Sequence, residues 1–539
     1  MRDRLRRALA APEALAGLSG LLTGLTHPNA SLVFLLPVCL VPLMAAVRGR
    51  TPRRAALLGQ LFGFVFWLTT VPWIAFTVHR FGEMHGAVAL LALLLAALIL
   101  AVPFAAVALA AALAAPVTPL GAAAVWTALW VAQEGIRTYF LGGFPWALLA
   151  APLADHPALA QSAALGGVLL TSGIVAAVNG LLHGAALAGG KRRLALAASA
   201  AALVGAAWLG GKARLGRLDT APGPSLPPLK VVLVQPNVSQ EVRFLSDERI
   251  RIYRDLLRQS EAVALAQRPG LVVWPESAVP YSWPWAPPLR DDLVAFCRRH
   301  STAVLFNTVW SDRPDDDDAP YYNSALLVTA DGPVLPPYHK QRLVPFGEYV
   351  PLGPLLRRIR PISRAVPGAF TPGEGTTLLP LGEWRLGGAV CYEVVYPWIA
   401  RAEVKAGASL LFTLTNDAWY GTAGARRQHW QAAAFRAVET GRPLLRAAVT
   451  GITGYVDGGG RSQALPVDRP GELAVTVGGE RGALRPLEPP PAQRAGDLWL
   501  LVCAAGSAAA ILRRRVLSPR GPAAPASPRA RGAERTVAP

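Results

Sequence analysis

Three side chains in this sequence could together carry out acyl transfer: a glutamate, a lysine and a cysteine. Glu276 and Cys391 each follow a short apolar run, and Lys340 lies between them in the sequence. A cysteine thiol, with an ordinary pKa of about 8.5, must lose its proton before it attacks a carbonyl, and a nearby carboxylate can accept that proton. A fixed ammonium group can stabilise the oxyanion that the attack creates. The set therefore predicts a thioester that waits for a second nucleophile.

Taken singly, each of these residues has a more ordinary explanation. A glutamate after a strand is usually a turn or helix cap, and a cysteine at the end of an apolar strand is usually a buried structural residue. A lysine alone indicates nothing. The prediction depends on the order of the three and on the core strands that two of them directly follow.

The segments around these residues resemble the nitrilase superfamily. The matching segments are Trp274-Pro-Glu276, His339-Lys340 and Cys391-Tyr-Glu393. The resemblance implies a four-layer αββα sandwich. It also implies that Glu276 is the general base, Lys340 stabilises the tetrahedral intermediate and Cys391 is the nucleophile.

Within that superfamily the sequence is most similar to the apolipoprotein N-acyltransferases. The shared segments are residues 134–137, 143–146, 234–238, 338–352, 415–421, 436–446 and 450–453. The resemblance implies that Glu348, Tyr392 and Glu393 are supporting residues, with the two glutamates assisting the catalytic three. Residues 423–427 depart from the family pattern, because they carry two arginines where a Gly-Pro-like approach is expected.

The same resemblance implies substrates that are held in a membrane. The acyl donor would be a phospholipid, typically phosphatidylethanolamine, and the acceptor the free amine of the N-terminal diacylglyceryl-cysteine of an apolipoprotein. No cofactor and no metal would be needed, and the enzyme would reside in the bacterial inner membrane. Phe81, Phe144, Pro145 and Trp146 either line a lipid entrance or form an aromatic belt at the membrane interface.

Short apolar and β-branched runs would position the reactive residues. We expect strands at residues 231–234, 271–274, 303–306, 325–328, 386–390 and 409–414, with helices at 247–267 and 289–300. Nearly continuous apolar strands joined by helices are typical of an α/β domain whose sheets are covered by helices. This domain would occupy residues 219–486, which is long enough for one large core.

The rest of the chain is too apolar for a soluble enzyme. Hydrophobic residues make up 52% of the 539, charged residues 16%, and the mean hydropathy is +0.34. We expect about eight membrane-spanning helices, at residues 8–25, 31–47, 55–76, 86–115, 120–132, 158–187, 194–210 and 498–512. The chain then divides into a membrane domain of about seven helices at 1–218, the polar domain, a C-terminal membrane helix at 487–512 and a disordered cytoplasmic tail at 513–539.

Arginine and lysine in the short loops predict the orientation of these spans. Cytoplasmic loops carry an excess of such residues, and here they gather before the first span and after the second, sixth and eighth: Arg2, Arg4, Arg6, Arg7, Arg48, Arg50, Arg53, Arg54, Lys191, Arg192, Arg193 and residues 513–515. Both termini would be cytoplasmic and the polar domain extracytoplasmic. Lys212, Arg214 and Arg217 are an exception, but they open a long domain, which translocates largely regardless of charge. A cleaved signal peptide at the N-terminus is the alternative, and its loss would break the alternation.

The sequence also argues against several other classes of protein. The net charge of +19 comes largely from clusters beside apolar runs, without a basic stripe interleaved with aromatics, so we expect no nucleic-acid partner. The four cysteines, Cys39, Cys297, Cys391 and Cys503, do not form a disulfide framework. The four aspartates at 315–318 indicate a solvated loop tip rather than a cation site.

Two other functions fit part of the sequence. One is a membrane-tethered amidase or nitrilase that uses water as the second nucleophile, which the three catalytic residues alone do not distinguish. The other is a transporter or binding scaffold with a relic enzyme domain. Transport pathways generally need ionisable groups at the middle of the membrane. Glu13 and Glu134 are the main candidates, and Glu134 lies near a span end with Arg137 three residues on, which disfavours transport.

Overall fold

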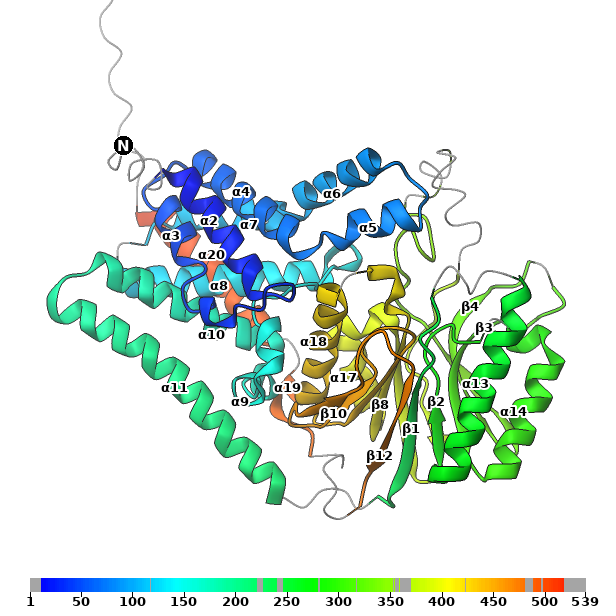
Figure 1. Cartoon of the computed structure of the whole chain (residues 1–539). Helices are drawn as coiled ribbons and strands as arrows, with labels where there is room; N and C mark the ends of the chain where they lie inside the picture. The colour runs from blue at the N-terminus through cyan, green and yellow to red at the C-terminus, as the bar shows by residue number, and fades with distance from the viewer. Residues whose placement is uncertain are drawn as a thin grey trace, which may run out of the picture.

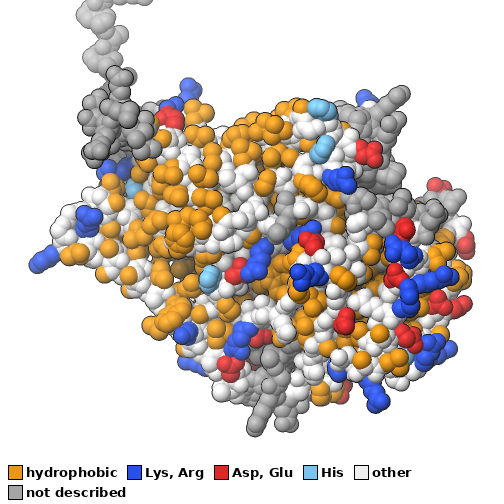
Figure 2. All heavy atoms as spheres, in the orientation of Figure 1, with side chains coloured by type: hydrophobic (Ala, Val, Ile, Leu, Met, Phe, Trp, Pro, Cys, Tyr) orange, Lys and Arg blue, Asp and Glu red, His pale blue; other side chains and the backbone are white. Residues whose placement is uncertain are grey.

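The structure is a computed structural model with a helical part and a β-sandwich part (Figure 1). It describes residues 11–116, 118–220, 226–239, 246–279, 282–316, 318–351, 353, 358, 370–421, 423–479, 488–495 and 498–517. The tail beyond 517, residues 221–225 and one of the four aspartates at 315–318 therefore lie outside the described residues. Figure 2 shows apolar side chains gathered over the helical part and charged side chains mostly over the sandwich.

The helical part contains eleven of the helices that the structure describes. They are α2 (Pro12–Thr26), α3 (Val41–Val47), α4 (Pro52–Thr70), α5 (Trp73–Arg80), α6 (Gly86–Leu100), α7 (Val102–Ala114), α8 (Pro119–Tyr139), α9 (Pro157–Ala160), α10 (Ala163–Leu187), α11 (Gly190–Thr220) and α20 (Leu498–Leu517). In the described part of the chain, three helical stretches are long and apolar enough to cross a membrane. They are α6 continued by α7 (Gly86–Ala114), α10 (Ala163–Leu187) and α11 (Gly190–Thr220). A fourth is added if the bent pair α4 and α5 counts as one. The expectation of about eight spans stays a prediction.

Residues 31–47 differ from the single helix that we expected. They form a 3-10 turn, η1 (Val33–Leu35), then a run of turns, and only afterwards α3. Pro37 and Pro42 explain the break, because proline has no backbone N–H and disrupts a helix interior. Asn179 of α10 compensates: its side chain accepts from Leu40 N at 2.8 Å and donates to Leu36 O at 2.7 Å. The interrupted backbone thus finds partners inside an apolar part of the molecule.

A second break directs the chain toward the sandwich. Pro72 separates α4 from α5, and the two helices are bent by 57°. Figure 1 shows α5 and α6 reaching over one edge of the sandwich. There Thr77 of α5 donates to the carbonyl oxygen of Trp419 at 2.8 Å. The helical part therefore contacts a loop of the polar domain directly.

The sandwich consists of two six-stranded sheets with the strand orders β12-β1-β2-β3-β4-β5 and β11-β10-β9-β8-β7-β6. The first sheet contains β1 (Leu229–Gln235), β2 (Leu271–Val273), β3 (Ala303–Trp310), β4 (Tyr322–Thr329), β5 (Gly332–His339) and β12 (Gly471–Val477). The second contains β6 (Leu379–Leu381), β7 (Trp384–Val390), β8 (Leu410–Thr415), β9 (Leu444–Ala448), β10 (Gly454–Val456) and β11 (Ser462–Ala464). The strands β1, β2 and β3 run parallel, as do β7, β8 and β9.

Helices cover the outer faces of both sheets. The helices α13 (Ser246–Gln267) and α14 (Pro287–His300) lie beside the first sheet, and α17 (Pro397–Lys405) and α18 (Ala423–Thr440) lie beside the second (Figure 1). One apolar core fills the space between the sheets, and another lies between the first sheet and its helices. The prediction of an α/β domain with helix-covered sheets is confirmed, with four layers in the order αββα.

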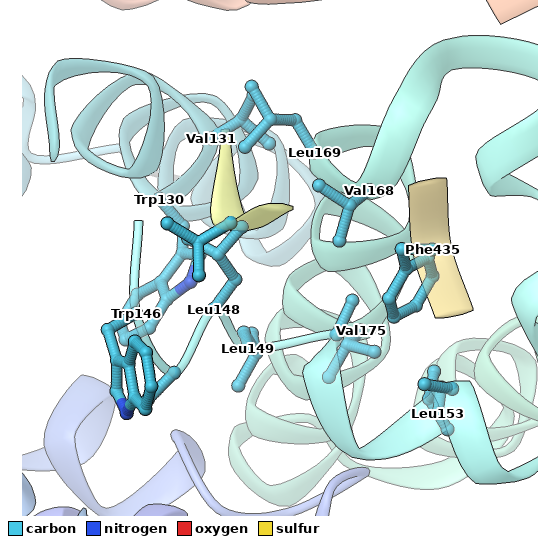
Figure 3. Close-up of a cluster of buried hydrophobic side chains, with 14 of the residues drawn as sticks. Trp130, Val131, Trp146, Leu148, Leu149, Leu153, Val168, Leu169, Val175 and Phe435 are labelled. Atoms are coloured by element: carbon cyan, nitrogen blue, oxygen red, sulfur yellow. The ribbon is translucent and has the colours of Figure 1, made fainter. Parts of the chain in front are cut away.

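The helical part packs on the outer helix layer of the second sheet. One continuous apolar cluster joins membrane helices to α17 and α18, and Figure 3 shows Phe435 of α18 close to Val168 and Val175 of α10. The backbone of α10 breaks at Gly167, where φ is +72°, and the carboxylate of Glu439 accepts from the N–H of Val168 at 2.7 Å. A side chain of the polar domain therefore caps a membrane helix at its break.

Candidate active site

The three predicted catalytic residues come together at one edge of the sandwich. Glu276 follows β2, Lys340 directly follows β5, and Cys391 directly follows β7. Because β4 is antiparallel to both β3 and β5, β5 runs in the same direction as β2, and the two strands end at the same edge. The Lys340 ammonium lies 3.6 Å from Glu276 Oε1. Both groups are close enough to Cys391 to shift the pKa of its thiol, in opposite directions.

Lys340 is a buried cation held between two carboxylates. Its side chain is 1% exposed, and Nζ donates to Glu348 Oε1 at 2.9 Å. Burial alone would lower the pKa of Lys340, but the carboxylates of Glu348 and Glu276 raise it above its ordinary value. The group therefore stays an ammonium ion, which is the form that can stabilise an oxyanion.

Asparagine and backbone donors orient the two carboxylates. Asn323 of β4 donates through Nδ2 to Glu348 Oε1 at 2.7 Å and to Glu276 Oε1 at 3.3 Å. Its own oxygen accepts from Asn307 of β3 at 2.6 Å. The second oxygen of Glu276 accepts from the N–H of Asn416 at 2.9 Å. Nothing in the sequence indicated a role for Asn307 or Asn323, which lie just outside the predicted strands 303–306 and 325–328 and belong to no recognised motif.

Cys391 occupies an unusual backbone position at the end of β7. Its φ of +55° lies in the left-handed region, which costs a residue with a side chain roughly 1–2 kcal/mol. Burial, and then the charge of Glu276, raise the pKa of the thiol, while Lys340 lowers it. The resting sulfur is therefore protonated, so a base must remove its proton before it can attack.

Glu393 fixes the turn that presents Cys391. Its carboxylate accepts from the backbone N–H groups of Val390, Gln341 and Arg342 at 2.7, 2.6 and 3.0 Å and from the hydroxyl of Tyr338 at 2.9 Å. Burial raises the pKa of Glu393 to about 7, although these backbone donors oppose the shift. Glu393 thereby ties the end of β7 to the segment that follows β5.

Glu348 holds Lys340 and also orders the loop to which it belongs. While Oε1 accepts from Lys340, Oε2 accepts from the N–H of Val344 at 2.8 Å. Within this loop Phe346 has a φ of +61° and is half exposed. The loop therefore presents the ring of Phe346 at the surface, while its Glu348 binds the Lys340 ammonium.

Tyr392 and its neighbours form a wall of aromatic rings supplied partly by the helical part. The ring of Tyr392 stacks with Phe144 and Trp146, each at 6.4 Å between centroids. Trp146 is buried, and its indole N–H donates to the side chain of Gln428. Phe81 lies against Trp419 at 4.8 Å. Phe81, Phe144 and Trp146 thus pack between the two parts of the molecule, and their role as a lipid entrance or as an aromatic belt stays a prediction.

A second polar cluster, not predicted from the sequence, lies behind the cysteine. Asp417, His429 and Arg446 are all fully buried, and Asp417 accepts from Arg446 Nη2 at 2.6 Å. Burial would raise the pKa of Asp417, but Arg446 lowers it far below its ordinary value. The signal in the sequence was a charged residue inside an apolar strand: Arg446 follows two leucines and precedes two alanines. Such a residue is almost never fully buried without a partner.

The segment that departs from the family pattern is neutralised by acidic partners. Arg426 lies 2.6 Å from Asp468, and Arg427 lies 2.9 Å from Asp155 of the helical part. These two arginines lie near the start of α18, and their ion pairs connect this helix to both parts of the molecule. Among the described residues, no group of three or more His, Cys, Asp or Glu side chains could hold a metal ion.

Two family models match this chain in succession. The model described as the apolipoprotein N-acyltransferase N-terminal domain matches residues 19–181, and the one described as carbon-nitrogen hydrolase matches residues 237–476. An apolipoprotein N-acyltransferase of Geobacter metallireducens is 31% identical and aligns with 93% of this chain and 95% of its own length. One from Azotobacter vinelandii is 34% identical, over 79% of this chain and 81% of its own.

A comparison with solved structures finds partial similarity to an amidase. An amidase of the nitrilase superfamily from Nesterenkonia AN1, solved as a variant, is 23% identical and covers 46% of this chain and 90% of its own, with a TM-score of 0.34.

Proposed function

Because this chain belongs to the apolipoprotein N-acyltransferase family, we propose that it moves a fatty acyl chain from a membrane phospholipid to the N-terminal amine of a diacylglyceryl-cysteine on apolipoproteins. The proposal is carried by one observation: Cys391 lies beside Glu276 and Lys340, and the residue after it packs on aromatic rings from the helical part. A site at this junction is suited to a substrate that remains in a bilayer.

In the first half of the reaction, Cys391 takes the acyl group from the phospholipid. Glu276 accepts the thiol proton while sulfur forms a bond to the ester carbonyl carbon, and Lys340 stabilises the oxyanion. When the tetrahedral intermediate collapses, the carbon–oxygen bond breaks and Glu276 protonates the leaving alcohol. The products are an acyl thioester on Cys391 and a lysophospholipid.

In the second half, the amine of the acceptor attacks the thioester. A carbon–nitrogen bond forms, Glu276 accepts the amine proton, and the carbon–sulfur bond breaks with its electron pair going to sulfur. Glu276 then returns a proton to Cys391. Glu348 and Glu393 support these steps, the first by holding Lys340 and the second by fixing the turn at Cys391.

We further propose about eight spans, with both termini cytoplasmic and the sandwich, residues 219–486, extracytoplasmic. The membrane domain would be residues 1–218, with a last span at 487–512 and a cytoplasmic tail at 513–539. This arrangement is supported by the basic loops and by α20, which packs against α8 of the membrane domain. Phospholipid, apolipoprotein acceptor and nucleophile would then meet at the outer leaflet.

The test uses the full chain in detergent micelles with a phospholipid and a synthetic diacylglyceryl-cysteine peptide. We expect lysophospholipid and N-acylated peptide in equal amounts by mass spectrometry, and neither product from the Cys391→Ala variant. A peptide whose N-terminus is acetylated should remain unmodified. If free fatty acid formed instead of acylated peptide, water would be the second nucleophile and the protein a lipid-directed hydrolase.

A further inference from the structure

A threonine hydroxyl lies between the sulfur of Cys391 and the carboxylate of Asp417. Thr415 is the last residue of β8, and its Oγ1 is 3.3 Å from Cys391 Sγ and 2.9 Å from Asp417 Oδ1. Among the described residues, Thr415 is the hydrogen-bond partner of the Cys391 sulfur. A hydroxyl has one proton to donate, so it can serve only one of these two acceptors at a time.

The state of each neighbour decides where that proton points. Asp417 is held as a carboxylate by Arg446, so it can only accept. When Cys391 is a thiol, the Thr415 hydroxyl donates to Asp417, and its oxygen faces the S–H group. When Cys391 is a thiolate, the hydroxyl can turn and donate to sulfur, while Asp417 keeps its ion pair with Arg446 Nη2 at 2.6 Å.

We propose that Thr415 is a further catalytic residue that stabilises the thiolate of Cys391 by turning its hydroxyl from Asp417 to sulfur. This inference rests on the proposed function, because a thiolate occurs at the attack on the phospholipid and again when the thioester breaks. The threonine proton never leaves its oxygen. Proton transfer remains between sulfur, Glu276 and the substrates, so the two half-reactions balance as written above.

His429 keeps the sulfur within reach of this hydroxyl. Its Nε2 lies 3.1 Å from the carbonyl oxygen of Cys391, which can only accept, so this nitrogen carries the proton. Its Nδ1 lies 3.1 Å from Arg446 Nη2, which can donate to it. His429 of α18, itself in contact with Arg446 of β9, thus holds the backbone of Cys391, while Thr415 contacts its side chain.

The charged groups around the sulfur act differently from Thr415. Glu276 and Asp417 raise the pKa of the thiol and Lys340 lowers it. Tyr420 also faces the site, and burial, the thiol and Asp417 raise its pKa well above its ordinary range, so it stays neutral. Removing the Thr415 hydroxyl leaves all four of these groups in place. A change in thiol reactivity would therefore follow from the loss of the hydroxyl and not from the loss of any of these four groups.

The test compares Thr415→Val with Thr415→Ser and with a matched control, Thr413→Val. Thr413 is an equally buried threonine two residues earlier on β8, and its hydroxyl has no hydrogen-bond partner among the described residues. The rate of alkylation of Cys391 by iodoacetamide is measured against pH on the full-length protein, with the modified cysteine identified by peptide mass spectrometry. This measurement requires no acyl transfer.

We expect Thr415→Val to raise the apparent pKa of Cys391 by about one unit, a tenfold loss of thiolate at a given pH, or about 1.4 kcal/mol. Thioester formation from phospholipid should slow by about the same factor, and both Thr415→Ser and Thr413→Val should behave as wild type. If Thr415→Val does not fold, Thr415→Ala removes the same hydroxyl and should give the same shift.

An alkylation profile for Thr415→Val or Thr415→Ala that matches wild type would overturn the inference. Failure of the proposed function has a different signature: Cys391→Ala would still acylate the acceptor peptide, whatever the alkylation profile of the threonine variants.

Discussion

Three glutamates, two of them buried and Glu348 partly buried, lie near Cys391, and their hydrogen bonds differ. Glu393 accepts hydrogen bonds from four donors. The two oxygens of Glu348 accept hydrogen bonds from Lys340, Asn323 and Val344. Glu276 accepts one strong backbone bond on Oε2 and one long bond on Oε1. It is also the carboxylate that shifts the pKa of the cysteine thiol. Glu276 is therefore the group available for proton transfer.

Glu276→Gln tests this assignment at the scale of one residue. The amide oxygen can still accept from Asn416, so we expect folding to be preserved while thioester formation falls by about 10²- to 10⁴-fold. The rate is measured by intact mass after mixing with phospholipid. A variant that forms the thioester at the wild-type rate would show that another group accepts the proton.

The sequence revealed the reactive residues better than their partners. Glu276, Lys340 and Cys391 stand in recognisable segments, whereas Asn323 stands in none, and Thr415 opens the shared segment 415–421 without any predicted role of its own. Their importance comes from contacts across the sandwich, such as Asn416 to Glu276 at a separation of 140 residues. Hydrogen bonds between residues so far apart cannot be inferred from local pattern, because they depend on how the two sheets are placed.

At the scale of elements, α5 is the membrane helix that contacts the active-site edge most directly. Gly421 ends η6 (Asp417–Tyr420) with φ +64°, and a Cβ there would lie 2.1 Å from a ring carbon of Phe76 on α5. Beside it, Trp73 of α5 meets Tyr420 at 5.0 Å between ring centroids. The contact leaves no room for a side chain at Gly421.

We therefore expect Gly421→Ala to slow acyl transfer by roughly tenfold, because it both strains a left-handed position and pushes α5 away from η6. The double variant Gly421→Ala with Phe76→Ala should recover part of the rate, since it removes the clash but not the strain. Equal rates in wild type and Gly421→Ala, measured by acylated peptide, would show that α5 does not influence the site.

The packing of α17 on β7 makes the stability of the sandwich depend on pH. Glu403 of α17 lies against Gly387 of β7, and both its oxygens lack partners among the described residues. Burial, and then the charge of Glu393, raise the pKa of Glu403 from 4.5 to about 8. Between these values the folded state binds more protons than the unfolded state, so stability falls as pH rises from about 4.5 through about 8.

Each pH unit in this range should lower the free energy of unfolding by up to about 1.4 kcal/mol. The variant Glu403→Gln has no proton to lose there, so its Tm should decline less than that of wild type between pH 5 and 8 (about the range of the titration). Thermal unfolding followed over this pH range checks the difference. Parallel curves for the two proteins would contradict the assignment.

Uninterrupted apolar strands were predicted from the sequence and the others were not, including β9, which lies inside the second sheet but carries Arg446 in its middle. The runs of buried apolar residues indicated β1, β2, β3, β4, β7 and β8, which lie inside the sheets and need no alternation. The strands β5, β6, β10, β11 and β12 are short, contain proline or glycine, or alternate between buried and exposed positions. Their pairing depends on partners elsewhere in the chain, which local composition does not reveal.

For the whole molecule, the alternation of basic loops predicts which side of the membrane each part occupies. The four cysteines are all buried, so new surface cysteines give a low background for labelling. Ser462 of β11 and Arg192 at the start of α11 are both exposed. In intact cells a membrane-impermeant maleimide should label Ser462→Cys, and it should label Arg192→Cys only after permeabilisation. The reverse pattern would invert the topology.

The proposed acyl transfer depends on an acyl thioester at Cys391. The direct measurement is the intact mass of the full-length protein after incubation with a phospholipid of defined chain length and no acceptor. We predict one added acyl chain on wild type and on Cys297→Ala, whose thiol is buried between α14 and the first sheet, and none on Cys391→Ala. The adduct should disappear when the diacylglyceryl-cysteine peptide is added. An unmodified wild-type protein that nevertheless acylates the peptide, or an equal adduct on Cys391→Ala, would contradict the mechanism.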